Sequence, residues 1–240
     1  MEQDSTNKPK VITGTAKWVL PPLQFSGRAK SQMNLAVHHL MAAAYSARKT
    51  YEIEQLNVGK PLGEFYTEII WNVSATVFFA VAGLEADVNE IFSASDTHFL
   101  QHDKLLVNQI WLLIEEKSIL EKYDMVSMLR TNHGLNKGEA SYDNVAGLIK
   151  LRNALVHFKP EWTDEKREHL KIERRLTGKF QLSPFLGSQD EFFPKRCMSH
   201  GCAEWAVKTA LTFRSELNKI GGLPDKFAPY AARLATRPVE

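Results

Sequence analysis

Apolar residues recur at helical spacing through most of this chain. In the stretch of residues 64–92, Trp71, Phe78, Ala82 and Ala86 are separated by 7, 4 and 4 positions, which is typical of one apolar stripe on a long helix. Turn-forming residues such as those of 57–63 and 221–222 interrupt the periodic stretches. The pattern predicts helices at about residues 26–57, 64–92, 105–123, 142–158, 164–175 and 197–220, with Ile110, Leu113 and Leu120 facing inward in the third.

The fold expected from this order is all-α, an up-and-down helical bundle of five to seven helices with irregular loops. Residues 1–25 are expected to form a flexible or irregular arm, residues 26–222 the helical domain and residues 223–240 a tail. Residues 131–141 are expected to form a loop, and residues 177–194, with two Pro and two Gly, a small hairpin or an ordered loop packed on the bundle. Pro160 disfavours helical geometry at Lys159, so the helix before it should end near His157. Residues 163–165 resemble a capped helix start.

Composition narrows the class of protein. With 240 residues and 44% apolar side chains, the chain can fill a core, and two cysteines exclude a disulfide framework. The longest run without a charged residue or a histidine has sixteen residues, 69–84, whereas a membrane span needs roughly 20, so we expect a buried helix and no membrane. No segment resembles a secretory signal, so we expect a cytoplasmic protein.

Charge is distributed unevenly along the chain. Residues 1–143 have 13 Lys and Arg against 17 Asp and Glu, a balance of −4, and residues 144–240 have 17 against 11, a balance of +6. A basic C-terminal part attracts a polyanion such as RNA, although a solvated helix surface explains the same excess.

One segment carries candidate chemistry. Arg152, Asn153 and His157 stand in the otherwise apolar string R-N-A-L-V-H near the end of a predicted helix. A guanidinium can hold phosphate oxygens, and an imidazole that titrates near neutrality can transfer protons, so the group can act on a phosphodiester. In the alternative, Arg152 pairs with a buried carboxylate and His157 caps the helix.

The same string resembles the R-x4-H motif of the HEPN superfamily, with Asn153 as the polar residue after the arginine. Two weaker strings, residues 79–89 and 202–206, are similar to helices of HEPN-like proteins, and the likeness spans roughly residues 30–220. The resemblance implies a bundle that dimerises through the motif-bearing helix. It implies a metal-independent endoribonuclease in which the RNA 2′-hydroxyl attacks the adjacent phosphate. His157 would then be the general acid or base, Arg152 would stabilise the phosphorane, and Asn153 would orient either group.

The resemblance leaves an alternative function open, because many HEPN-like proteins are non-catalytic nucleotide-binding or assembly modules. Some toxin-type members have a tyrosine two residues after the histidine, where this chain has Lys159. This departure weakens assignment to the subgroup that is silenced by modification of that tyrosine. The expected partners are RNA or a nucleotide, a second copy of the chain and an antitoxin-like protein.

Supporting residues are expected around the motif. Glu85 on a facing helix could position Arg152, or the two could form a purely structural pair, and Asn89 lies one turn after Glu85. Glu161 and Trp162 follow the motif closely, where they could line the cleft and stack a base. Trp162 could instead pack the next helix onto the bundle.

The segment of residues 197–202 fits either a metal site or a packed core. Cys197, His200 and Cys202 have a C-x2-H-x-C spacing, but zinc needs a fourth ligand and Cys202 shares an apolar stripe with Trp205. We therefore expect a core thiol, no metal and no cofactor. The chain lacks the Walker, dinucleotide-binding, H-E-x-x-H and G-x-S-x-G motifs.

Overall fold

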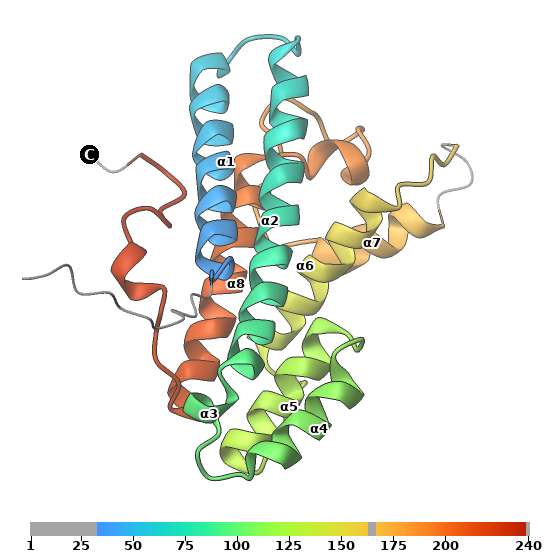
Figure 1. Ribbon diagram of the computed structural model, residues 1–240. Helices are drawn as coiled ribbons and strands as arrows, with labels where there is room; N and C mark the ends of the chain where they lie inside the picture. Colours follow the sequence, from blue (N-terminus) through green and yellow to red (C-terminus); the bar gives the residue numbers. More distant parts are fainter. Residues whose placement is uncertain (1–32, 163–166, 239–240) are drawn as a thin grey trace, which may run out of the picture. The chain divides into compact units, whose positions relative to one another are not determined.

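The computed structural model describes residues 33–162 and 167–238, and all regular structure in these ranges is helical (Figure 1). The all-α prediction is confirmed, and the described ranges hold eight α-helices rather than five to seven. The predicted arm of residues 1–25, the first part of the predicted 26–57 helix and the predicted cap at residues 163–165 lie outside the described residues. The elements are α1 (Ala36–Asn57), α2 (Phe65–Ser93), α3 (Ser95–His98), α4 (Lys104–Ile114), α5 (Ile119–Thr131), α6 (Ala140–Val156), α7 (Glu168–Leu176), η1 (Phe192–Arg196), α8 (His200–Gly221) and η2 (Ala228–Tyr230).

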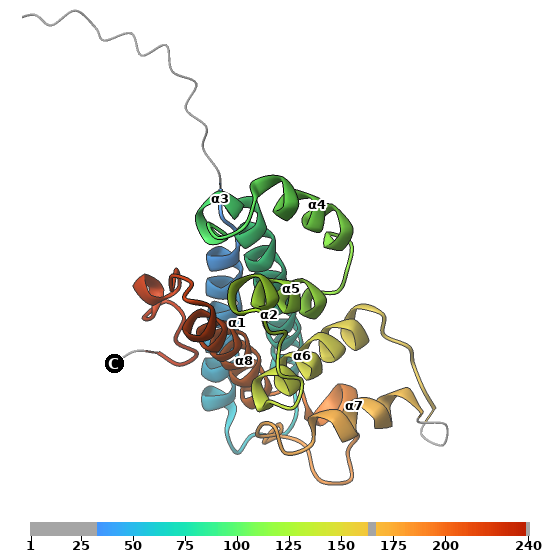
Figure 2. The ribbon, with the colours of Figure 1, turned by 90° about the horizontal axis from the view of Figure 1, so that it is seen from below.

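Helices α1, α2, α6 and α8 form the bundle. α1 and α2 run antiparallel side by side, α8 packs against both, and α6 contacts α2 and α8 (Figures 1 and 2). Leu40, Val77, Leu84 and Leu148 are among the fully buried side chains between these helices. α5 closes one end of the bundle against α2 and α8, and α7 packs on the outer side of α6. Burial of aliphatic side chains between the four helices therefore supplies the main stabilisation.

The buried face of α2 differs from the stripe expected from the sequence. Its buried row includes Ile69, Val73 and Val77, whereas Trp71 is 65% exposed and Phe78 is 37% exposed. α2 is apolar around most of its circumference, so periodicity identifies the helix without identifying the side that faces the core. The structure thus leaves a row of large apolar side chains on the outside of α2.

Within the described ranges, α2 is the one helix that is long and apolar enough to cross a membrane. Its row of fully buried residues, however, packs against the other helices of the bundle. A core helix passes the same test, so this finding leaves the cellular location as a prediction.

The single helix expected at 105–123 is two helices, α4 and α5. Ser118 caps α5 in a capping box, because its Oγ accepts the Glu121 N–H and the Glu121 carboxylate accepts the Ser118 N–H at 2.9 Å. This cap begins a new helix in the middle of the predicted one. Leu113, expected inside, is 75% exposed, whereas Ile110 and Leu120 are partly buried against the core.

The ends of α6 and α8 follow the local sequence. α6 ends at Val156 with His157 as its C-cap, in agreement with the effect expected from Pro160. α8 begins after Ser199, whose Oγ accepts the Cys202 N–H at 3.1 Å, and ends at Gly221, with Gly222 as its C-cap at φ +62°.

A cluster of charged side chains lies inside the bundle. The fully buried Asp87 carboxylate of α2 pairs with the Arg214 guanidinium of α8. It also accepts the Tyr123 hydroxyl of α5 at 2.8 Å, and Lys226 Nζ lies 2.7 Å from its other oxygen. The cluster therefore joins α2, α5, α8 and the segment after α8 through one carboxylate.

Candidate functional site

Two polar residues of α6 and its C-cap residue face one cavity. Lys150, Asn153 and His157 follow the i, i+3, i+7 spacing of a single helix face, all three are exposed, and all three line a cavity of about 220 Å³. The opposite side of α6 places Leu148 and Leu151 in the core. Hereafter the His157 cavity is the one lined by Lys150, Asn153, Ala154, His157, Lys159, Glu168, His169, Ile172 and Phe193.

His157 lies directly after the last residue of α6, as the C-cap of this helix. Its backbone N–H closes the last turn by donating to the Asn153 carbonyl at 2.9 Å. Its imidazole makes no hydrogen bond or ion pair with any residue in the described ranges, and it is exposed. The ring is therefore free to accept or donate a proton to a ligand in the cavity.

The far wall of the cavity carries a second histidine, His169, in the first turn of α7. Its ring is buried, stacked on Phe158 at 5.5 Å between centroids and edge-on to Phe193 at 5.0 Å. Nε2 lies 3.0 Å from the Lys159 carbonyl oxygen, which can only accept, so Nε2 is the donor. The ring is thus fixed by packing and by a hydrogen bond, unlike that of His157.

Glu161 fixes the first turn of α7, which contains His169. Its carboxylate accepts the backbone N–H groups of Glu168 at 2.8 Å and His169 at 3.2 Å, which caps the start of α7. Desolvation opposes the ionised form of Glu161, but these two hydrogen bonds and the nearby His169 outweigh it and lower the pKa of the carboxyl group. Glu161 therefore holds the segment after α6 against α7, and it does not itself line the cavity.

Arg152 has a different environment from its neighbours. Its side chain is partly buried and does not line the His157 cavity, since it lies about 100° around α6 from Asn153. Its guanidinium makes no hydrogen bond or ion pair within the described ranges, and the same holds for the Glu85 carboxylate on α2. The structure therefore does not form the expected Arg152–Glu85 pair within the described ranges, and the joint action of Arg152 with His157 stays a prediction.

The remaining supporting residues are dispersed. Lys159 lines the cavity. Asn89 accepts a hydrogen bond from the buried Lys122 of α5 at 3.3 Å, away from the cavity. Trp162 is 80% exposed, so its indole does not pack the next helix onto the bundle, and it does not line the cavity.

The residues of the C-x2-H-x-C string lie inside the protein. Cys197 and Cys202 are buried free thiols, and burial raises the pKa of Cys197 to about 12. His200 Nε2 donates to the Thr236 carbonyl at 3.1 Å. In residues 33–162 and 167–238 no three His, Cys, Asp or Glu side chains are grouped so that they could hold a metal ion.

Sequence reasoning missed Lys150 and His169 as members of the site. Lys150 could have been found, because it precedes Asn153 and His157 by three and seven positions on the same face. His169 lies on another helix, and no local spacing relates it to the motif.

Comparisons of the chain with protein-family models, curated proteins and solved structures found no match. The resemblance to the HEPN superfamily therefore rests on the short strings of the sequence.

Proposed function

We propose that the protein is a HEPN-like, metal-independent endoribonuclease of a toxin or defence type. The observation that carries the proposal is the His157 cavity, in which an exposed imidazole shares a cavity with two lysine side chains, Lys150 and Lys159, and the amide of Asn153. Cationic side chains favour a phosphodiester ligand, and an unpartnered imidazole can transfer protons to and from it.

In the proposed reaction, His157 removes the proton of the RNA 2′-hydroxyl, and the 2′-oxygen attacks the adjacent phosphorus. The bond from phosphorus to the 5′-oxygen breaks, and a proton passes to that oxygen, which leaves a 2′,3′-cyclic phosphate. The ammonium groups of Lys150 and Lys159 stabilise the negative charge of the phosphorane. The steps consume no metal ion or cofactor.

The proposal includes a homodimer, because the HEPN resemblance implies that Arg152 and His157 of two protomers line one cleft. The apolar row on the outside of α2 supports a second copy as its cover: Ile70, Trp71, Phe78 and Phe79 are all at least 37% exposed. A cytoplasmic location and an antitoxin-like protein that neutralises the ribonuclease belong to the same proposal.

Cleavage of RNA by the purified protein in EDTA tests the proposal. We expect His157→Ala to lower the rate about 10²–10⁴-fold, the usual contribution of a proton-transfer group. The matched control is His38→Ala, which changes an exposed histidine of α1 outside the cavity and should leave the rate unchanged. Intact RNA with the wild-type protein, or equal cleavage by wild type and His157→Ala, refutes the enzyme.

A comparison of Lys150→Ala with Arg152→Ala distinguishes a phosphate held in the cavity of one protomer from a phosphate held by the arginine of the HEPN-like motif. If the cavity of one protomer holds the phosphate, Lys150→Ala lowers the rate strongly. If the HEPN resemblance is right about the arginine, Arg152→Ala does so as well, although this side chain does not line the cavity of its own protomer.

The second candidate function is a non-catalytic HEPN-like nucleotide-binding or assembly module, and the position of Arg152 outside the cavity favours it. In this case wild-type protein leaves RNA intact but binds a nucleotide such as AMP, and Lys150→Ala weakens that binding. Calorimetric titration with AMP measures this directly. Absence of both cleavage and AMP binding removes both candidates.

A further inference from the structure

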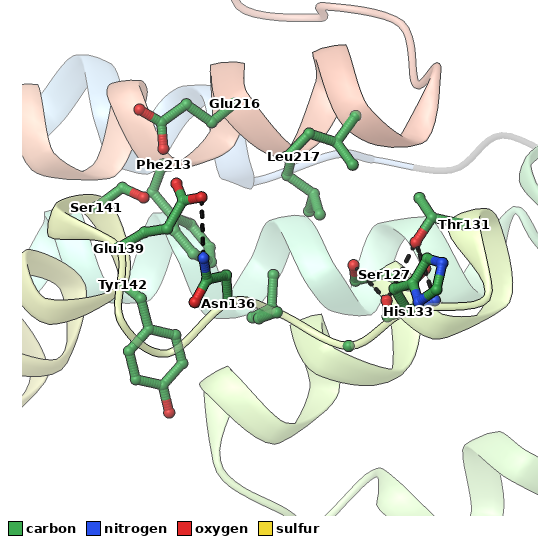
Figure 3. A pocket seen from close by; sticks show the side chains of 13 residues that line it. Ser127, Thr131, His133, Asn136, Glu139, Ser141, Tyr142, Phe213, Glu216 and Leu217 are labelled. Atoms are coloured by element: carbon green, nitrogen blue, oxygen red, sulfur yellow. Dashed lines mark hydrogen bonds between the residues drawn. The ribbon is translucent and has the colours of Figure 1, made fainter.

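A second cavity, of about 190 Å³, lies where the end of α5, the following loop, the start of α6 and the end of α8 meet (Figure 3). It shares no lining residue with the His157 cavity. Pockets for drug-sized ligands span about 300–1,000 Å³, so this cavity suits a small, narrow ligand.

The loop wall of this cavity is held in place. The Asp124 carboxylate of α5 accepts the Leu135 N–H at 2.6 Å, and Ser127 Oγ donates to the His133 carbonyl at 2.8 Å. Gly134 lets the loop approach this closely, since a Cβ there would lie 2.7 Å from an Asp124 carboxylate oxygen. The cavity is therefore formed before any ligand binds, which reduces the cost of binding.

Two carboxylates share one end of the cavity. Figure 3 shows Glu139, at the start of α6, and Glu216, on α8, at the same end next to Ser141. Glu139 accepts one hydrogen bond from the Asn136 amide at 3.3 Å, and Glu216 makes no hydrogen bond or ion pair with the part of the chain that the structure describes. Among the described residues, neither lysine nor arginine lines this cavity, so the two negative charges lack a cation.

Most of the exposed surface inside the cavity is apolar, although Ser127, Thr131 and His133 also line it. Phe213 and Leu217 of α8 are buried and form its floor beside the carboxylates, and Leu135 and Tyr142 contribute to the walls. An ordered side chain supports this floor, because the Phe213 ring packs edge-on against Tyr123 at 5.1 Å. A ligand that fits must combine a positive end with a short apolar body.

We propose that this cavity binds one end of an aliphatic primary amine, such as a diamine or polyamine. One ammonium group lies between the Glu139 and Glu216 carboxylates, where its three N–H donors form charge-assisted hydrogen bonds. The methylene chain lies along Phe213 and Leu217. The site is independent of the His157 cavity, so it stands or fails separately from the proposed ribonuclease.

Calorimetric titration of the full chain with 1,4-diaminobutane and with spermidine tests this site. We expect saturable binding with one molecule per chain, and no binding of 1,4-butanediol, which has the same carbon chain without the charges. Glu216→Gln and Glu139→Gln should each raise the Kd about tenfold, because each removes one charge-assisted partner. Glu115→Gln changes an exposed carboxylate outside the cavity and should leave the Kd unchanged.

Three results overturn the proposal: no binding of either amine, equal binding of the diol, or an unchanged Kd in both glutamine variants. Circular dichroism melts of each variant show whether it is folded. Since the two carboxylates come from different helices, either variant alone decides the question if the other fails to fold.

Discussion

Asp87→Asn is the substitution for which the structure predicts the largest loss of stability without any change of side-chain volume. The Asp87 carboxylate is fully buried and pairs with Arg214, which is only 3% exposed. It also binds Lys226 and accepts the Tyr123 hydroxyl at 2.8 Å. An amide in its place keeps the shape but leaves the guanidinium buried without a counter-charge.

The magnitude follows from the cost of an uncompensated buried charge. Removing one partner of a buried ion pair costs about 3–5 kcal/mol. For a chain of this size, each kcal/mol lowers the Tm by about 2–4 °C, so Asp87→Asn should lower it by roughly 6–20 °C. Tyr123→Phe removes the hydroxyl that lies 2.8 Å from the Asp87 carboxylate and 2.9 Å from the Leu84 carbonyl oxygen, and should cost about 1.5–3 kcal/mol.

Thermal melts and urea unfolding monitored by circular dichroism measure this series. The control is Asp143→Asn, because Asp143 also pairs with two cations, Arg175 and Lys179, but its side chain is 44% exposed. Water screens that pair, so the expected loss is about 1 kcal/mol or less. Should Asp87→Asn cost no more than Asp143→Asn, the reasoning that burial makes this carboxylate essential is refuted.

The other predictions concern a close backbone contact, a buried histidine and the outer face of α2. Gly201→Ala should destabilise the protein by about 1–3 kcal/mol, because its Cβ would lie 2.3 Å from the Gln181 carbonyl oxygen. Its control is Gly187→Ala, whose Cβ would have no neighbour closer than 3.9 Å and which should cost less than about 0.5 kcal/mol. Urea unfolding measures both. Burial lowers the pKa of His200 below 6.5, so the neutral ring stabilises the fold above pH 6.5 and this contribution is lost as the pH falls through the folded-state pKa. His200→Gln should therefore show a smaller loss of unfolding free energy than wild type between about pH 7.5 and about pH 5, and equal losses contradict the assignment. If α2 forms the proposed dimer, Trp71→Glu should convert a wild-type dimer to a monomer in sedimentation velocity, and a wild type that is already monomeric contradicts the dimer.

Helix positions could be predicted where one local feature sets them. The expected helix 64–92 is α2 within one residue at each end, because turn formers precede it and its interior contains no breaker. The end of α6 at Val156 follows from Pro160. The break between α4 and α5 was missed, since the cap at Ser118 lies within a continuous run of helix formers.

The direction that a helix faces could not be predicted in the same way. Trp71 and Ile69 are both large and apolar, and only the packing of α1, α6 and α8 decides that Ile69 is buried and Trp71 is exposed. Sequence periodicity contains no information on where the neighbouring helices lie when both sides of a helix are apolar.

In the candidate site, too, the sequence motif alone does not tell which residues of α6 face the same cavity. Residues 152 and 157 are five apart, so their side chains diverge by about 140° around α6, whereas residues 150, 153 and 157 project from one face. The cavity between α6 and α7 follows the second set, and it therefore brings Lys150 rather than Arg152 to the imidazole of His157. An arginine that acts with His157 must then reach it from outside this cavity, and in the proposed homodimer the partner's copy of α6 would supply it. A phosphate bound by Lys150 therefore requires one chain, whereas a phosphate bound by Arg152 beside His157 requires two.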